Sequence, residues 1–334
     1  MAIDIGIDLG TSTTIIYEKT QGIVLSEPSL VIKSNTGSQV VAIGDAASDM
    51  MGRTPEGVSE VFPIRHGVIT GFNATVAMLK SFVKKVTKGS FNRVRAVICI
   101  PGGITEVERR AVYEAARMAG IRDVVLRDAP VAGALGCGVD IGEAHGSMVV
   151  DIGAGICEAA VVSLGGVVVS HTIRTGGSNF DADIVQHIRR QYNMIIGDST
   201  AEGIKISIGS VYSGMETEIL EVNGRDMVTG LPKSAKVTSD EIRMCLSETA
   251  DAIVDAVKVT LENTPPELAA DVMEGGIVLV GGGAMLKGLG RLININTEIP
   301  VYIAENPIDC VATGAGKAVE FMMDERGRGI LGRQ

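Results

Sequence analysis

The chain has 334 residues, enough for about two domains, and 46% of them are hydrophobic against 21% charged. This composition excludes a disordered chain, because so much apolar side chain can form a large core. The formal net charge of −10 argues against general binding to nucleic acid, which needs a basic surface.

The cysteines and the apolar runs indicate the cellular compartment of the protein. Five scattered cysteines without a CxxC pair are typical of a reduced, cytoplasmic protein. The first ten residues, MAIDIGIDLG, contain no basic stretch, so we expect no signal peptide. No apolar run approaches the ~20 residues that cross a bilayer. We therefore expect a cytoplasmic protein that at most lies on the inner face of the plasma membrane.

The first half of the chain alternates strands and helices. In chain order we expect strands at 3–17 (two, joined by a turn at 8–12), 94–100 and 124–126, with helices at 105–118 and from 130. Thr105 and Glu108 form a capping box at the start of the first of these helices. This strand–helix–strand–helix order predicts an α/β protein with a parallel sheet between helices.

The second half repeats this pattern. In chain order we expect strands at 148–151, 158–163, 167–173 and 277–280, with helices at 181–192, from 238 to about 263, and from about 316. Thr238 and Glu241 form a second capping box, and Pro265 and Pro266 end the long helix that it starts. The polar tail after residue 324 is expected to fray.

One motif occurs in both halves. An apolar strand ends in Asp-x-Gly, a turn follows, and a second strand returns, first at DLGTST (8–13) and again at DIGAGI (151–156). Two similar domains that face each other across a cleft would bring both turns to one ligand. Each motif could alternatively be no more than a hairpin turn.

The chemistry of the two turns points to a nucleotide. Glycine-rich turns offer backbone N–H groups to phosphates, and the hydroxyls of Thr11, Ser12 and Thr13 add donors. Without a metal ion, an aspartate before each turn would repel the phosphates. Asp8 and Asp151 are better explained by a Mg²⁺ ion that they hold through waters.

A third glycine-rich turn follows the strand at 277–280. Its sequence, GGGAM (281–285), lets the backbone approach an adenine or a ribose. The sequence does not match the GxGxxG dinucleotide-binding motif, because Leu286 stands where the motif requires its last glycine. The chain also contains no GxxxxGK[ST] motif. These absences argue against dehydrogenases and P-loop enzymes.

Together the three turns resemble the actin-like ATPase fold of actins, sugar kinases and large heat-shock chaperones. Within this fold the chain closely resembles the bacterial MreB and Mbl proteins over nearly its whole length. The resemblance is carried by IGIDLGT (5–11), GRTP (52–55), VERRA (107–111), MVVDIG (148–153), TAE (200–202), PPELA (265–269) and VGGGA (280–284).

The resemblance implies two ribonuclease-H-like lobes with four subdomains around ATP and Mg²⁺. Lobe I would span 1–145 plus 315–334, with its small subdomain near 30–65. Lobe II would span 146–314, with its small subdomain near 181–240.

The resemblance also implies roles for individual residues. Those implied to hold phosphates are Gly10, Thr11, Ser12, Thr13, Gly153, Ala154, Gly155, Gly176 and Gly177. Those implied to meet or close over the adenosine are Glu202, Ile204, Lys205, Gly282, Gly283, Ala284 and Met285. Asp8 and Asp151 would organise the Mg²⁺ shell.

The chain departs from the family at its catalytic motif. Relatives carry Glu-Glu-Pro where this sequence has Asp128-Ala129-Pro130. The second Glu positions the attacking water, and Ala129 cannot accept a hydrogen bond from it. Ile156 and Cys157 also replace two threonines of the second phosphate turn. We therefore expect weak or absent ATP hydrolysis with nucleotide binding retained, unless Asp128 substitutes as the catalytic carboxylate.

The resemblance further implies self-assembly into paired protofilaments, contact with related filaments and the cell-wall synthesis machinery, and a role in cell shape. Phe91, in a basic loop, would touch lipid, although the loop could simply be solvated. Nucleic acid is not expected as a partner.

Three alternative functions remain open: a non-polymerising modulator of a related filament, a small-molecule kinase, and a chaperone-type ATPase. The last lacks room for a peptide-binding domain.

Overall fold

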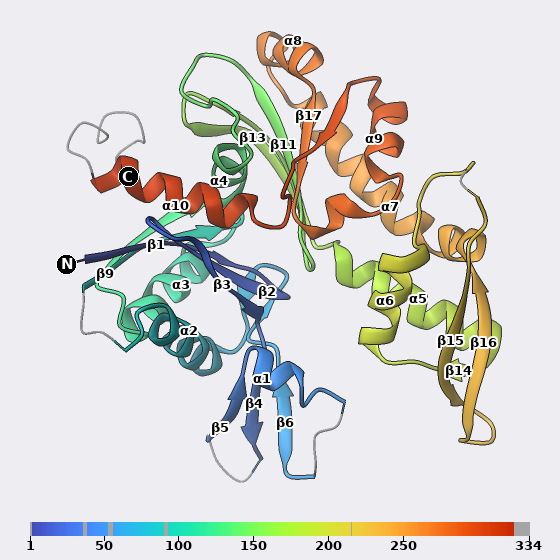
Figure 1. Cartoon of the computed structure of the whole chain (residues 1–334). Coiled ribbons are helices and arrows are strands. Elements are labelled where there is room, and N and C mark those ends of the chain that lie inside the picture. The colour runs from blue at the N-terminus through green and yellow to red at the C-terminus, as the bar shows by residue number, and fades with distance from the viewer. Residues whose placement is uncertain (1, 36–38, 53–55, 90–92, 215, 324–334) are drawn as a thin grey trace.

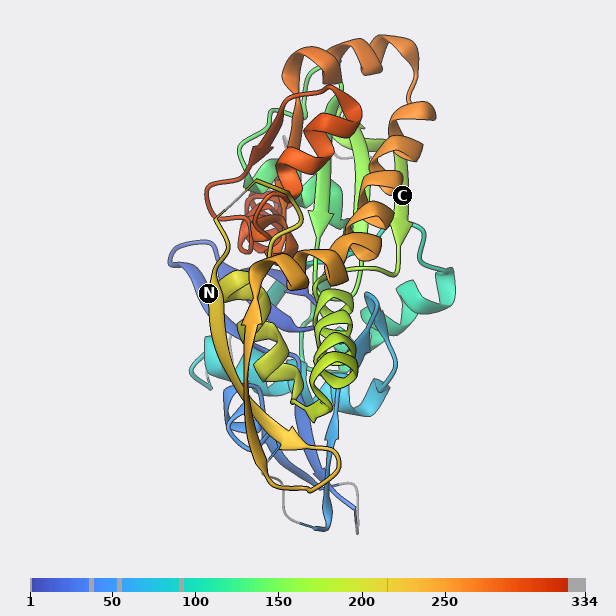
Figure 2. The ribbon, with the colours of Figure 1, turned by 90° about the vertical axis from the view of Figure 1, so that its right-hand side faces the viewer.

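The protein consists of two lobes, each built around a five-stranded sheet (Figure 1). The computed structural model describes residues 2–35, 39–52, 56–89, 93–214 and 216–323. A smaller subdomain extends from each lobe. Figure 2 shows the β15–β16 hairpin reaching beyond α5 and α6 at the end of lobe II.

The two large sheets have the same topology. The strands of lobe I run in the order β3 (Gly22–Pro28), β2 (Thr13–Glu18), β1 (Ala2–Leu9), β9 (Arg93–Ile100) and β10 (Asp123–Asp128). The strands of lobe II run in the order β13 (Gly166–Ile173), β12 (Cys157–Ser163), β11 (Ser147–Ile152), β17 (Ile277–Val280) and β18 (Val301–Ile303). In each sheet the first three strands are antiparallel and the last two run parallel to the central strand. The internal repeat predicted from the sequence is thereby confirmed.

Helices cover the faces of both sheets. Those of lobe I are α2 (Phe72–Val86), α3 (Glu106–Met118), α4 (Ala129–Gly136) and α10 (Cys310–Met323). Those of lobe II are α7 (Ser239–Glu262), α8 (Pro266–Gly275), the short 3₁₀ helix η1 (Gly282–Met285) and α9 (Leu289–Thr297). Both predicted capping boxes are confirmed, because Thr105 caps the N–H of Glu108 and Thr238 caps that of Glu241. These caps satisfy N–H groups that the first helical turn leaves unpaired.

The two small subdomains contain the remaining elements. That of lobe I contains β4 (Val31–Ser34), β5 (Val40–Ile43), α1 (Asp45–Ser48) and β6 (Val58–Val61), and the two-stranded hairpin β7 (Ile64–Arg65) and β8 (Val68–Ile69) follows it. That of lobe II contains α5 (Gly177–Tyr192), β14 (Met194–Ile195), α6 (Asp198–Ile208), β15 (Ile219–Asp226) and β16 (Pro232–Thr238).

Helix α4 lies between the two large sheets and contacts both. Its Ala132 packs with Val97 of lobe I, and its Val131 and Ala134 pack with Val149 of lobe II. Helix α10 packs along α4 so closely that a Cβ on Gly136 or on Gly314 would overlap the backbone of the other helix. The lobes therefore meet through two helices whose backbones touch.

Two predicted helix starts were wrong. The last helix begins at Cys310 rather than near residue 316. Gly314 and Gly316 lie inside it, where they make room for the backbone of α4 and for the side chain of Tyr17 on β2. Helix α5 begins at Gly177 rather than at Asp181. The side-chain oxygen of Asn179 accepts the backbone N–H of Gly176 at 2.9 Å and so supports the earlier start.

Candidate functional site

The first turn, between β1 and β2, is held by Ser29 at the end of β3. The hydroxyl of Ser29 donates to the carbonyl of Gly10 at 2.7 Å, and its backbone N–H donates to the carbonyl of Ser12 at 2.8 Å. The Thr14 and Ser29 hydroxyls also bond to each other at 2.8 Å. Sequence reasoning missed Ser29, because the hairpin register that brings it to the turn is not visible in a local motif.

The second turn, between β11 and β12, rests on the start of α5. The N–H groups of Gly177 and Ser178 donate to the carbonyls of Gly153 and Ala154 at 2.9 and 2.8 Å. A Cβ on Gly176 would lie 2.5 Å from the carbonyl oxygen of Gly153. The predicted phosphate residues 153–155, 176 and 177 therefore form one continuous piece of structure.

The two turns touch each other across the lobes. A Cβ added to Gly155 would lie 2.7 Å from Oγ1 of Thr11. That oxygen also accepts the N–H of Gly67 at 3.1 Å, and Nδ1 of His66 donates to the carbonyl of Gly155 at 3.0 Å. His66 and Gly67 form the β7–β8 turn, where His66 adopts φ +48°. This strained turn joins the first glycine-rich turn to the second.

The third turn follows β17, the strand beside β11. Because Asp151 pairs with Val280 in the parallel register, Gly281 lies next to Asp151. A Cβ on Gly281 would lie 2.5 Å from Oδ1 of Asp151, and Gly281 has φ +80°. Ala284 is buried, whereas Met285 is 59% exposed. All three glycine-rich turns thus gather at the same end of the two sheets.

Three acidic side chains have strongly raised pKa values at this end. Burial, with the nearby charge of Asp151, raises the pKa of Asp8 to about 7. Burial raises the pKa of Asp151 to about 6. Burial also raises the pKa of Glu158 to about 7, against the lowering effect of a hydrogen bond from Gly102. Asp8 and Asp151 were predicted from the sequence, whereas Glu158 was missed.

These acids fit a divalent cation that is held through water. Carboxylates that repel each other in a buried site are stabilised by a positive charge between them. Within the residues described, no group of three or more His, Cys, Asp or Glu side chains could hold a metal ion directly. Mg²⁺ commonly keeps several waters and takes only one or two carboxylates. Asp8 and Asp151 therefore have the chemistry to hold Mg²⁺ through water beside the glycine-rich turns.

Three of the predicted adenosine residues, Glu202, Ile204 and Lys205, lie on α6, and the other four form η1. The ammonium of Lys205 pairs with Asp181 at 2.8 Å and donates to the carbonyl of Gly177 at 3.1 Å. Glu202 is exposed, whereas Ile204 as a whole residue is only 2% exposed. Ile204 therefore presents almost no surface to a ligand.

The position predicted to be catalytic lies where β10 meets α4. Ala129 is the first residue of α4 and is buried. The carboxylate of Asp128 lies 3.9 Å from Arg109 of α3, and its side chain is 43% exposed. Asp128 is thus turned toward α3.

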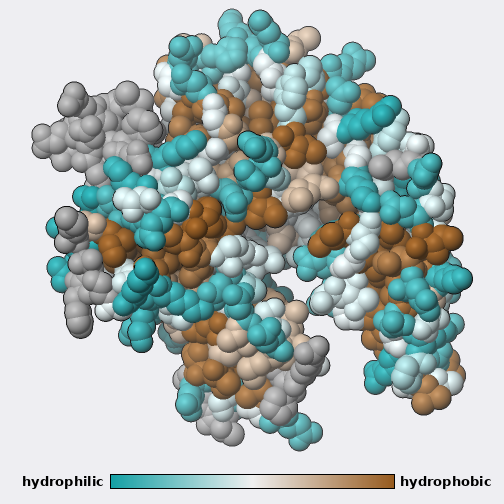
Figure 3. Space-filling model, viewed as in Figure 1, coloured by the Kyte–Doolittle hydropathy of each residue, from teal (hydrophilic) through white to brown (hydrophobic). Residues whose placement is uncertain are grey.

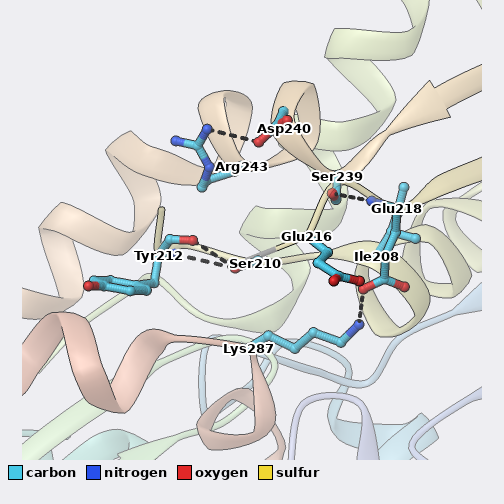
Figure 4. Close-up of a pocket in the computed structure, with 9 residues that line it drawn as sticks. All are labelled: Ile208, Ser210, Tyr212, Glu216, Glu218, Ser239, Asp240, Arg243 and Lys287. Atoms are coloured by element: carbon cyan, nitrogen blue, oxygen red, sulfur yellow. Dashed lines mark hydrogen bonds and ion pairs between the residues drawn. The ribbon is translucent and has the colours of Figure 1, made fainter. Parts of the chain in front are cut away.

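A separate pocket lies where the end of α6, the start of α7 and the segment after η1 meet (Figure 4). It is lined by Ile208, Ser210, Tyr212, Glu216, Glu218, Ser239, Asp240, Arg243 and Lys287. Lys287 pairs with Glu218 at 2.9 Å, and Arg243 pairs with Asp240 at 3.1 Å. These basic groups are neutralised within the protein, so we assign no ligand to this pocket.

Comparison with known proteins decides the family. The family model described as MreB/Mbl protein matches residues 2–326. The chain belongs to the MreB/Mbl family. Cell shape-determining protein MreB of Escherichia coli (strain K12) is 48% identical over 337 residues, which cover 99% of this chain and 97% of the relative. Cell shape-determining protein Mbl of Bacillus subtilis (strain 168) is 44% identical over 322 residues, which cover 96% and 97%.

Solved structures confirm the actin-like fold of this MreB/Mbl chain. The crystal structure of MreB5 of Spiroplasma citri bound to ADP has a TM-score of 0.91 at 36% identity, covering 99% of this chain and 98% of that one. The same protein bound to AMPPNP has a TM-score of 0.89 at 35% identity, covering 96% and 97%. The MamK double helical filament shares the fold, with a TM-score of 0.82 at 22% identity, covering 96% and 99%.

Phe91, which was predicted to touch lipid, lies outside the residues that the structure describes. Among the described helices, none is long and apolar enough to cross a bilayer.

Proposed function

We propose that this MreB/Mbl chain binds ATP with Mg²⁺ between its lobes, assembles with copies of itself into filaments, and serves bacterial cell shape. The convergence of three glycine-rich turns and two acidic side chains on one site carries the proposal. The relatives named above support it, since two are cell shape-determining proteins and Spiroplasma citri MreB5 was solved with ADP and with AMPPNP. The protein would work in the cytoplasm, with peripheral contact to the inner face of the plasma membrane.

We further propose that hydrolysis is slow. Two observations support this: Ala129 presents only a methyl group, and the carboxylate of Asp128 lies near Arg109. Groups that position and polarise the attacking water contribute about 10²–10⁴-fold to such a reaction. ATP binding depends on the glycine-rich turns and on the metal. A chain without the water-positioning carboxylate would therefore still bind ATP.

Three measurements on the purified chain test the proposal. A fluorescent ATP analogue should bind in the presence of Mg²⁺ and be displaced by unlabelled ATP. Phosphate release should be at least about tenfold slower than that of Escherichia coli MreB assayed in parallel. Sedimentation and negative-stain microscopy should show polymer with Mg·ATP. Equal rates of phosphate release would contradict slow hydrolysis, and absent binding would contradict the nucleotide site.

The polymer assay also separates the alternatives. A chain that binds nucleotide and joins the filaments of a relative, without forming its own, would be a modulator. Nucleotide-dependent phosphorylation of a small molecule, without polymer, would favour the kinase.

A further inference from the structure

Lys287 joins three elements of lobe II through a single ammonium group. It lies two residues after η1, the third glycine-rich turn. Its Nζ donates to the carbonyl of Ser207, in the last turn of α6, at 2.7 Å. The same Nζ pairs with the carboxylate of Glu218, directly before β15, at 2.9 Å (Figure 4). Lys287 therefore ties the segment after η1 both to α6 and to the base of the β15–β16 hairpin.

The main chain around Lys287 is fixed to the segment that follows α6. Lys287 and Ser210 form a parallel β-bridge, and the N–H of Val211 donates to the carbonyl of Lys287 at 3.0 Å. Gly288 has φ +84°, and a Cβ on it would lie 2.4 Å from the Cβ of Tyr212. Because its backbone is held in this way, the side chain of Lys287 extends from a fixed point.

The two groups that accept from Lys287 are held as well. The N–H of Glu218 donates to the hydroxyl of Ser239, the first residue of α7, at 2.9 Å, and the N–H of Ser239 donates to the carbonyl of Glu218 at 2.9 Å. Carbonyls in the last turn of a helix lack a helical partner, and a cation there also stabilises the helix dipole. An exposed ion pair alone contributes little, but anchored groups lose little freedom when they meet. The ammonium therefore holds the end of α6 at a defined distance from η1.

The two elements that meet at Lys287 are those predicted to hold adenosine. Lys205 lies on α6, two residues before Ser207, and η1 spans Gly282–Met285. The bonds of Lys287 thus lie at the C-terminal ends of both elements. A change in these bonds would alter the spacing of the predicted adenosine residues without removing any of them.

We propose that Lys287 is a positioning residue that sets the gap between α6 and η1 for the adenosine of ATP. This inference rests on the proposed function, in which the chain binds ATP. Lys287 acts through the backbone of the two elements and not by touching the nucleotide. A gap that is already set spares the nucleotide the cost of ordering these elements, and such preorganisation raises affinity.

Lys287→Met tests this role, because methionine keeps an apolar stem but lacks the ammonium. Mg·ATP and Mg·tripolyphosphate, which lacks the adenosine, are compared as competitors of the fluorescent ATP analogue. The affinity for ATP should fall about fivefold, the scale of one hydrogen bond, whereas that for tripolyphosphate should not change. A variant that is merely less stable would lose affinity for both competitors.

A rescue and a control accompany this variant. Lys287→Arg keeps a cation at the same place and should recover most of the affinity for ATP. Lys258→Met is the matched control. Lys258 also joins two elements of lobe II, since it donates from α7 to the side chain of Asn296 on α9 at 3.0 Å. It lies outside the predicted adenosine residues, so its loss should leave the affinity for ATP as in the wild type.

The partner carboxylate gives a second variant. Glu218→Gln removes the ion pair and leaves the bond from Lys287 to Ser207, so the affinity for ATP should fall by a smaller factor. Because Glu218 acts through Lys287, the double variant Lys287→Met with Glu218→Gln should bind ATP no more weakly than Lys287→Met alone. Glu218→Gln also replaces Lys287→Met in all measurements if the methionine variant does not fold.

Amide hydrogen exchange of the nucleotide-free protein tests the gap itself. Exchange in Lys287→Met should become faster at residues 205–211 and 282–288 and stay unchanged at residues 153–156. The inference is overturned if exchange in the first two segments stays as in the wild type, if the affinity for ATP does not change, or if ATP and tripolyphosphate lose affinity by the same factor. A wild type that does not bind Mg·ATP would overturn the proposed function, and the exchange rates would still show whether Lys287 fixes the gap.

Discussion

Thr11 and Gly155, from the glycine-rich turns of opposite lobes, lie so close together that no side chain fits on Gly155. A Cβ built on Gly155 would lie 2.7 Å from Oγ1 of Thr11 and 3.1 Å from the backbone nitrogen of His66. Real Cβ atoms do not approach a neighbour so closely, and protein interiors do not absorb such overlaps freely. The lobes therefore lie against each other at these two turns. Only a glycine at position 155 allows this close approach.

Gly155→Ala should push the two turns apart. We expect a loss of stability of about 1–3 kcal/mol, as for other overpacked sites, with weaker binding of Mg·ATP. Thermal denaturation and titration with a fluorescent ATP analogue measure the two effects. Gly166→Ala, at the start of β13, is the control, since a Cβ there meets nothing within 4 Å. Wild-type affinity in Gly155→Ala would show that binding does not need this closure.

His66→Ala should loosen the connection between the lobes. It removes the hydrogen bond from Nδ1 to the carbonyl of Gly155, which is worth about 1 kcal/mol. Nucleotide affinity should fall about fivefold, and amide hydrogen exchange around residues 153–156 should become faster. His171→Ala, on β13, is the control of the same residue type. Unchanged exchange in His66→Ala would contradict the role of the β7–β8 turn.

The nucleotide-free protein should lose stability as the pH rises from about 4 to about 7. The pKa values of Asp8, Asp151 and Glu158 are raised to about 7, 6 and 7 from ordinary values of 3.8, 3.8 and 4.5. The folded protein then binds these protons more tightly than the unfolded chain, so the free energy of unfolding falls through this window. Thermal denaturation at pH 5 and at pH 7.5 measures the fall.

Two changes should reduce this pH dependence. Mg·ATP supplies a cation beside the acids and should restore stability at pH 7.5. Asp8→Asn removes one of the charges and should raise the free energy of unfolding at pH 7.5 by at least about 1 kcal/mol, since one pKa unit corresponds to about 1.4 kcal/mol. The same variant should bind Mg·ATP more weakly. A nucleotide-free protein that is more stable at pH 7.5 than at pH 5 would contradict the raised pKa values.

Ala129→Glu should speed phosphate release. If the missing carboxylate limits hydrolysis, the added glutamate should raise the rate by about 10–10²-fold without changing nucleotide affinity. Ala129→Gln is the matched control, because it has the same size without the charge. An unchanged rate in Ala129→Glu, in a variant that still binds Mg·ATP, would show that another step is slow.

The β15–β16 hairpin should take part in assembly. Its tip exposes Val228 and Leu231, which are 85% and 65% exposed. Figure 3 shows hydrophobic residues at the end of this hairpin. Exposed apolar clusters mark interaction sites. Val228→Ser with Leu231→Ser should raise the protein concentration needed for sedimentable polymer and leave nucleotide binding unchanged. Polymer at the wild-type concentration would exclude the hairpin from the contact.

The sequence predicted those parts of the fold that depend on local patterns. The two Asp-x-Gly hairpins were predicted because an apolar strand, a glycine turn and a returning strand are contiguous in the chain. The capping boxes at Thr105 and Thr238 were predicted because their partners are three residues apart. Helices α2 and α8 were missed. Gly71 supplies no side-chain cap for α2, and Pro266 was interpreted only as the end of α7.

The residues missed at the site depend on contacts between distant segments. Glu158 reaches the N–H of Gly102, 56 residues away in sequence, and His66 reaches the carbonyl of Gly155, 89 residues away. No local spacing indicates either pair. Strand alternation could have flagged Glu158, because it is an acidic residue in a strand that is otherwise apolar or small from Cys157 to Val162.

The close approach of α4 and α10 would make this helix pair the axis of any rotation of one lobe relative to the other. Neither glycine at the crossing tolerates a side chain, and the ammonium of Lys317 on α10 donates to the carbonyl of Leu135 at the end of α4, at 2.9 Å. Rigid-body rotation about such a fixed line is amplified with distance from it. A small rotation of one lobe that separates the two glycine-rich turns would therefore move the far tips of both lobes over a much larger distance than it moves the turns.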